Sequence, residues 1–128
     1  MCIRKAAPDR GRLRGAELND ANFANASFRD ADLREVQFHA ADLRAANFAG
    51  AKLCQAYLRD AKVAQSNFTG ADLTGASLRG CDCTGVLFAE SRLDEASLID
   101  ADLRHSKYLT KPQLARAVID NTRLPDFD

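Results

Sequence analysis

The chain has 128 residues, of which 46% are hydrophobic and 7% aromatic, and its 18 basic and 18 acidic side chains balance. This length indicates one domain, and the balanced charge argues against a bulk attraction to nucleic acid or to anionic membranes. No apolar run approaches the ~20 residues of a membrane-spanning helix, and the first residues lack the apolar stretch of a secretory signal. We therefore expect a soluble, cytoplasmic protein.

Residues 1–15 form a basic N-terminal segment, with five basic residues and one acidic residue. Within it, Leu13 keeps the spacing of the repeat that follows, but Gly11 stands where the repeat has Ala. Ile3 and Pro8 fall in the same register. We interpret the segment as a solvated terminus or a cap. A basic arm that contacts an acidic partner is the alternative.

From Ala16 to Thr110 the sequence repeats every five residues, in nineteen consecutive copies of A-(D/N)-(L/F)-x-x. We call the large apolar residue of each copy the centre, and the residue two positions before it the inner small position. The centres are ten Leu, six Phe, Val63, Cys83 and Tyr108. Thirteen of the nineteen inner small positions hold Ala. The other positions carry nearly all the charges and glycines of the segment, so we expect them to face solvent.

This five-residue period matches neither the 3.6-residue period of a helix nor the alternation of a flat strand. Side chains two residues apart share a face of an extended chain, so the centre and the inner small position point into one interior. The last two residues of a copy, often Arg-Asp or Thr-Gly, are typical of a turn. Short extended stretches and turns at a fixed interval predict an all-β solenoid.

Tandem copies such as Ala31-Asp32-Leu33 and Ala71-Asp72-Leu73 resemble the motif of the pentapeptide-repeat proteins, and the match spans residues 16–110. The resemblance implies a right-handed quadrilateral β-helix with four pentapeptides per coil, and hence nearly five coils. Residues twenty apart should then stack. We name the four sides of the coil after their first centres: the Leu18, Phe23, Phe28 and Leu33 sides.

The Phe28 side is distinguished by an aromatic column of inward-pointing centres. Rings spaced by the strand separation of ~4.8 Å lie within the favourable range for aromatic stacking. We interpret the column as a structural core stack and not as a binding site. Its members are Phe28, Phe48, Phe68, Phe88 and Tyr108.

Residues 111–128 leave the repeat, and we expect a short capping α-helix followed by a tail. Thr110 and Gln113 have the spacing of a capping box, and Pro112 is tolerated in a first helical turn. A solenoid end needs cover, so the apolar face of this helix should lie over the last coil. That face comprises Leu114, Ala117 and Val118. Similar segments close many members of the family and in some relatives build a homodimer, so the resemblance also implies a homodimer through this end.

No catalytic, cofactor-binding or metal-binding constellation emerges. His39 and His105 fall in outward positions, and neither has a carboxylate or nucleophile at a motif spacing. Cys81 and Cys83 both point inward; a metal pair is one interpretation, but residues one coil away supply no further ligand, so we favour packing groups. The four cysteines lack C-x-x-C spacing and indicate reduced thiols. We expect no enzyme, no cofactor and no small-molecule substrate.

The favoured function is a non-catalytic scaffold that mediates protein–protein interaction with an unidentified partner. The alternative follows from the resemblance, because some family members mimic duplex DNA and bind type II topoisomerases such as DNA gyrase. Mimicry needs a strongly negative rod. The repeats carry a net charge of only −4, with −2 on each of the Leu18 and Leu33 sides and zero on the other two. We expect no direct contact with nucleic acid or membrane.

Overall fold

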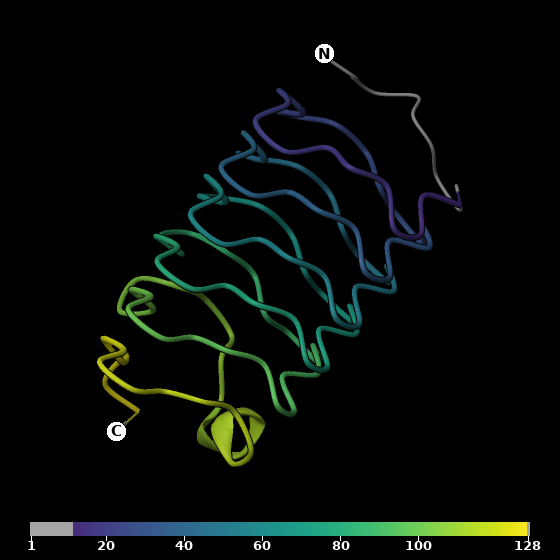
Figure 1. Ribbon diagram of the computed structural model, residues 1–128. Helices are drawn as coiled ribbons and strands as arrows, with labels where there is room; N and C mark the ends of the chain where they lie inside the picture. Colours follow the sequence, from purple (N-terminus) through teal and green to yellow (C-terminus); the bar gives the residue numbers. More distant parts are fainter. Residues whose placement is uncertain (1–11, 128) are drawn as a thin grey trace.

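The computed structural model describes residues 12–127, which form an all-β solenoid whose coils stack into a rod (Figure 1). Each pentapeptide contributes a short bridging stretch, and parallel β-bridges join residues 20 apart, such as Ser27 and Asn47. Four pentapeptides therefore complete one coil. The bridges begin at Arg12, so the ladder already includes the pentapeptide centred on Leu13. The expectations for residues 1–11 lie outside the described residues.

Backbone hydrogen bonds join each coil to the next in a repeated pattern. The N–H of a centre donates forward, as from Phe48 to the carbonyl oxygen of Asn67 at 2.7 Å. The residue before the centre twenty positions later donates back, as from Asn67 N–H to the carbonyl oxygen of Ala46 at 2.9 Å. We call such a pair of bonds a rung. The stretches are too short for a named strand, and the described part of the chain has one helix, the 3₁₀ helix η1 at Lys111–Leu114, which is too short to cross a membrane.

Two features of the repeat explain how each corner turns. The last residue of a pentapeptide adopts a left-handed backbone, as at Gly50 with φ 69°, and Gly, Asp and Asn tolerate this region best. Where an Asp or Asn precedes the centre, its side chain helps to close the same corner. Oδ1 of Asn47 accepts the N–H of Ala49 at 2.9 Å, and Oδ1 of Asp72 accepts the N–H of Thr74 at 3.0 Å. Such side-chain turns account for the second letter of the motif.

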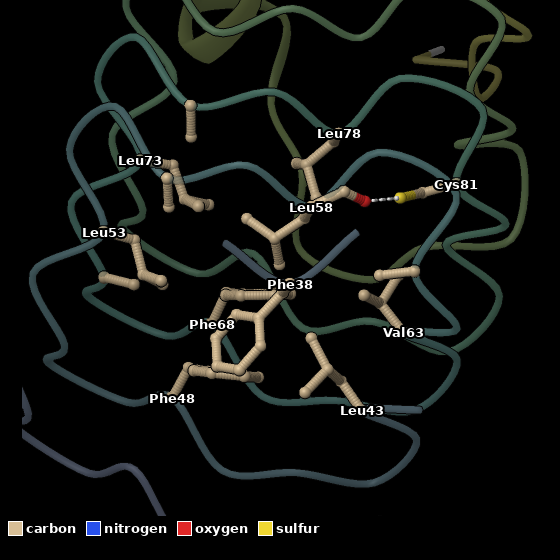
Figure 2. Packing of buried hydrophobic residues seen from close by; sticks show 14 of the residues in the cluster. Phe38, Leu43, Phe48, Leu53, Leu58, Val63, Phe68, Leu73, Leu78 and Cys81 are labelled. Carbon is tan, nitrogen blue, oxygen red and sulfur yellow. Dashed lines mark hydrogen bonds between the residues drawn. The ribbon is translucent and has the colours of Figure 1, made fainter. Parts of the chain in front are cut away.

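Stacked phenylalanines form one wall of the core, as the sequence predicted. Four rings on the Phe28 side are fully buried, and Figure 2 shows two of them, Phe48 and Phe68, in the interior among centres from the other sides. Successive centroids along the column lie 5.2, 4.9 and 6.0 Å apart, with interplanar angles of 9°, 7° and 11°. This confirms the column for Phe28, Phe48, Phe68 and Phe88.

The prediction that Tyr108 is the fifth member of the column is wrong. Its side chain is 70% exposed, and its backbone has a φ of 62°, which is the corner conformation and not that of a centre. Leu109 instead packs against the core. The physical reason is a register shift of one residue, which turns the phenol out to water and brings the apolar neighbour in.

The predicted C-terminal α-helix is also wrong in type and extent. The structure has the four-residue 3₁₀ helix η1, which begins after Thr110 and ends at Leu114. The chain then pairs with the coil again: Val118 bridges Ser97, and Arg123 bridges Asp102, each across 21 residues. A longer helix would direct its N–H groups along its own axis, whereas here Val118 N–H donates to the carbonyl oxygen of Ala96 at 2.8 Å.

The three residues predicted to share a helical face therefore have different environments. Leu114 is buried in the core cluster and Ala117 packs against it. Val118 is 41% exposed, because it lies on the outside of a bridging stretch. The predicted inward face thus holds for two of the three residues, although no α-helix carries them.

Candidate functional site

Exposed apolar side chains gather at the C-terminal end of the rod. Of the six large hydrophobic residues exposed in residues 12–127, all but Tyr57 lie between Tyr108 and Phe127. A depression of about 430 Å³ at this end is lined mainly by apolar side chains. A second, of about 520 Å³, lies beside it and shares Lys111, Pro125 and Phe127. We call the exposed members that line them the C-terminal apolar patch: Tyr108, Ile119, Leu124 and Phe127.

Gln113 fastens η1 to the last coil and so supports this patch. Its Oε1 accepts the N–H of Thr110 at 2.7 Å, as the predicted capping box requires. Its Nε2 donates to the carbonyl oxygens of Phe88 at 2.8 Å and Ser91 at 2.9 Å. No further coil follows the last one to pair with its carbonyl groups. The Gln113 side chain therefore supplies hydrogen-bond donors to two of them.

Two hydrogen bonds hold the chain beyond η1 in the same way. Thr122 Oγ1 donates to the carbonyl oxygen of Leu98 at 2.6 Å, and Asn121 Nδ2 donates to Asp100 Oδ1 at 2.6 Å. Together with the bridges of Val118 and Arg123, they keep the segment that carries the patch against the rod (Figure 1). The patch is therefore a positioned surface and not a loose tail.

The four sides of the rod differ from the C-terminal end, because oppositely charged neighbouring residues form ion pairs on them. Arg34 donates twice to the carboxylate of Asp32, at 2.8 and 2.7 Å, and Arg44 donates twice to Asp42, at 2.9 and 2.6 Å. The hydrogen bonds from Arg34 lower the pKa of Asp32 to about 2. Arg104 and Asp102 form a third such pair. These carboxylates are neutralised locally, and exposed pairs of this kind contribute little to stability.

A shallow depression of about 460 Å³ on the Leu18 side surrounds Tyr57, whose side chain is 53% exposed. His39 lines it, and its Nδ1 lies 3.1 Å from the carbonyl oxygen of Arg59. A carbonyl oxygen can only accept, so Nδ1 carries the proton in the neutral ring. An aromatic residue at an outward position was the one signal of this depression in the sequence.

The three cysteines in residues 12–127 are free thiols, two of them buried. Burial raises the pKa of Cys81 to about 12 and that of Cys83 well above its ordinary value. The pKa of the half-buried Cys54 is also raised, mainly by burial. No three His, Cys, Asp or Glu residues of the described chain come together as metal ligands. His39 and His105 are both exposed, so the structure does not bring them to a shared site.

Comparisons with known proteins support the fold. The chain is similar to the solved pentapeptide repeat protein Rfr23 from the cyanobacterium Cyanothece 51142, with 18% identity, a TM-score of 0.74 and coverage of 89% of this chain and 88% of that one. It is similar to full-length QnrB1, a plasmid-mediated fluoroquinolone resistance protein, with 16% identity, a TM-score of 0.71 and coverage of 99% and 85%. The pentapeptide repeat protein alr5209 from Nostoc PCC 7120 has 23% identity, a TM-score of 0.53 and coverage of 95% and 97%.

No curated protein matches the sequence significantly. The family described as the pentapeptide repeat region matches residues 12–98, which is more than half of the chain. That range lies within the part of the chain whose bridges join residues 20 apart. The chain therefore belongs to the pentapeptide-repeat family.

Proposed function

We propose that the protein is a non-catalytic scaffold that binds another protein through its C-terminal end. The observation that carries this proposal is the C-terminal apolar patch. Exposed apolar side chains around a depression are typical of protein contact sites, and aromatic residues such as Tyr108 and Phe127 supply the large contact area that such sites use. The cytoplasm is the proposed location, because the described cysteines are free thiols.

A second copy of the chain is the proposed first partner. Two copies that meet end to end about a twofold axis would present the same patch to each other, which is the commonest arrangement of soluble homodimers. Such a contact would cover Ile119, Leu124 and Phe127 and leave the four sides free for a further partner.

We further propose that η1 and the stretch after it cap the rod, and that the coil has the right-handed winding of the family. The contacts that support a cap are the burial of Leu114 and the hydrogen bonds from Gln113 to Phe88 and Ser91. In this proposal a single segment has two faces. The inner face covers the last coil, and the outer face carries the patch.

DNA mimicry remains the alternative proposal, and the geometry of the charges weighs against it. Three of the wall carboxylates, on Asp32, Asp42 and Asp102, bind a neighbouring arginine with both oxygens. A surface that imitates phosphates needs carboxylates free to meet cationic groups. The likeness to QnrB1 concerns the fold, at 16% identity. A gyrase supercoiling assay distinguishes the two proposals, because inhibition at low micromolar protein would favour mimicry.

Light scattering on a purified sample tests the scaffold proposal. We expect a molar mass near twice the monomer value of 14.0 kDa. Ile119→Asp, which places a charge in the patch, should return the protein to a folded monomer. Tyr57→Asp is the matched control, because it places the same charge on an exposed apolar side chain of the Leu18 side. A monomeric wild type at all concentrations would overturn the proposed homodimer.

A further inference from the structure

The β-ladder is interrupted at one place in the body of the rod. Every centre from Leu13 to Phe88 donates its N–H to the next coil except Val63. The matching back bond, from Asp82 N–H to the carbonyl oxygen of Ala61, is missing as well, and so is the bridge between Lys62 and Asp82. The interruption thus removes one complete rung of the Phe23 side, although the flanking corner bond from Gln65 remains.

A cleft of about 290 Å³ opens at the missing rung. Its walls come from the two coils that the rung would join, with Ala61, Lys62 and Val63 on one and Gly80 and Asp82 on the other. Charged side chains of both signs, from Arg44, Asp60 and Lys62, lie at its rim. Two independent features, the hydrogen-bond pattern and the cavity, therefore locate the same gap.

The residues behind the gap explain why the coils separate there. Val63 and Cys83 are consecutive centres of the Phe23 side, and both are smaller than the Leu or Phe found at the other buried centres. The apolar packing that holds two coils together is therefore weakest at this point. Cys81 occupies the inner small position beside them, and its thiol donates to the carbonyl oxygen of Leu58 at 3.1 Å, as Figure 2 shows.

Bulk at the inner small position does not break a rung by itself. Val36 and Val86 occupy the same position and are larger than cysteine, yet each keeps its rung to the preceding coil. Gln37 N–H donates to the carbonyl oxygen of Ala16 at 2.9 Å, and Leu87 N–H donates to that of Ser66 at 3.1 Å. What distinguishes Cys81 is its polar contact with the preceding coil, together with the small centres.

The gap leaves backbone groups of both kinds without a partner in the described chain. The donors are the N–H groups of Val63 and Asp82, and the acceptors are the carbonyl oxygens of Ala61 and Asp82. Ala61 and Val63 are buried, and buried backbone groups in native proteins nearly always find a partner. A ligand for this gap must therefore both donate and accept hydrogen bonds within a small space.

We propose that ordered water occupies this gap and bridges the two N–H groups to the two carbonyl oxygens in place of the missing rung. A buried water typically makes about three hydrogen bonds, and its share of volume is ~30 Å³, so the cleft has room and enough polar partners. We call this place the hydrated seam. The charged residues that line the cleft balance, with Arg44 and Lys62 against Asp60 and Asp82, so they do not select an ion of one sign.

The seam has a consequence for the dynamics of the rod. A rung that passes through water opens with less loss of direct contact than a rung made of two backbone bonds, and small local openings set the rate of amide exchange. The seam is thus the place where the repeat body opens first. The other sides of the same coils keep their rungs, as at Phe48 to Asn67 and Asn67 to Ala46.

Amide hydrogen exchange of the wild-type protein, followed by NMR, tests the seam. The amides of Val63 and Asp82 should exchange at least about tenfold faster than those of Leu43 and Asp102, their counterparts one coil away with intact bonds. Water-to-amide cross-relaxation should show a water near both seam amides. Exchange as slow as at Leu43 and Asp102 would overturn the seam, and fast exchange without a nearby water would overturn its occupant.

A double variant tests whether the two cysteines cause the missing rung. The double change Cys81→Ala and Cys83→Leu restores the motif, and Leu43 and Leu103 show that the column accepts leucine. We expect this variant to slow the exchange of the Val63 and Asp82 amides to that of their counterparts. Cys54→Ser is the control, because it removes a thiol outside the seam and should leave all four rates unchanged. Equal rates in the double variant and the wild type would contradict the proposed cause.

Discussion

The repeat body, residues 12–107, and the C-terminal end, residues 108–127, use the same ladder in different ways. In the body, bridges join residues 20 apart, and Tyr57 is the one large hydrophobic residue of residues 12–107 that is exposed. In the end, bridges join residues 21 apart, and the exposed large hydrophobics concentrate there. One added residue at Tyr108 is enough to change the register. The five-residue period thus secures the fold, and the departure from it creates the surface that we propose as the contact site.

The two regions also differ in what satisfies their backbone. In the body, backbone groups of one coil are the main partners of the next coil, with the rung at Val63 missing. At the end, side chains take over: Gln113 binds the carbonyl oxygens of Phe88 and Ser91, and Thr122 binds that of Leu98. The end therefore depends on particular residues, whereas the body depends on repetition.

The largest effect should come from removing an aromatic ring of the body. Phe68→Ala leaves a cavity between Phe48 and Phe88 and should lower the free energy of unfolding by about 3–5 kcal/mol. Tyr108→Ala removes an exposed ring of the end and should change it by less than about 0.5 kcal/mol. Thermal or denaturant unfolding measures both. Equal losses from the two variants would remove the distinction between the buried and the exposed aromatic residue.

A second comparison adds bulk instead of removing it. Ala71→Leu overfills a fully buried inner small position and should destabilise the protein by about 1–3 kcal/mol. Ala115→Leu adds the same bulk at an exposed position just after η1 and should be nearly neutral. Unfolding of both variants in urea provides the test. A neutral Ala71→Leu would contradict the close packing of the interior.

The attachment of the end to the body can be weakened directly. Gln113→Ala removes the donor to Phe88 and Ser91 and the acceptor of Thr110 N–H, and should lower the stability by about 1–2 kcal/mol. Exchange of amides in residues 110–114 should accelerate more than exchange in the body. Asn121→Ala serves as the milder control, because it removes one exposed hydrogen bond to Asp100. An equal effect of the two variants would mean that Gln113 has no special role.

The smallest effect concerns the ion pairs of the body. Arg34 lowers the pKa of Asp32 to about 2, so the stability from this pair is complete above the ordinary carboxyl pKa of ~3.9 and is lost as the pH falls through about 2. In Arg34→Gln the titration midpoint of Asp32, followed by NMR, should move up toward the ordinary value. An unchanged midpoint would show that another group sets this pKa.

The sequence predicted the body well because its evidence repeats. Each pentapeptide offers the same test of which residues face inward, and the spacing of twenty places Phe28, Phe48, Phe68 and Phe88 in one column. The family resemblance supplied the four sides, which the five-residue period alone does not determine. The missing rung at Val63 escaped prediction, although two small consecutive centres in one column were visible in the sequence.

The C-terminal end was predicted less well, because each of its sequence signals occurs once and different signals favour different structures. The capping box of Thr110 and Gln113 is present, but the spacing of Leu114, Ala117 and Val118 suggested a helix where the coil offers backbone partners instead. Tyr108 kept the period, yet its hydroxyl would need a partner in the interior. This requirement was the signal in the sequence against an inward-pointing Tyr108. A chain that leaves a repeat is governed by such local contacts, which a period cannot reveal.

Concentration-dependent hydrogen exchange of the wild-type protein shows whether the body forms the rod and the end makes the contact. Raising the protein concentration should slow exchange in residues 108–127 and leave the amides of residues 16–107 unchanged. Ile119→Asp should abolish the concentration dependence. Slower exchange along the sides of the body, with none at the end, would contradict the account.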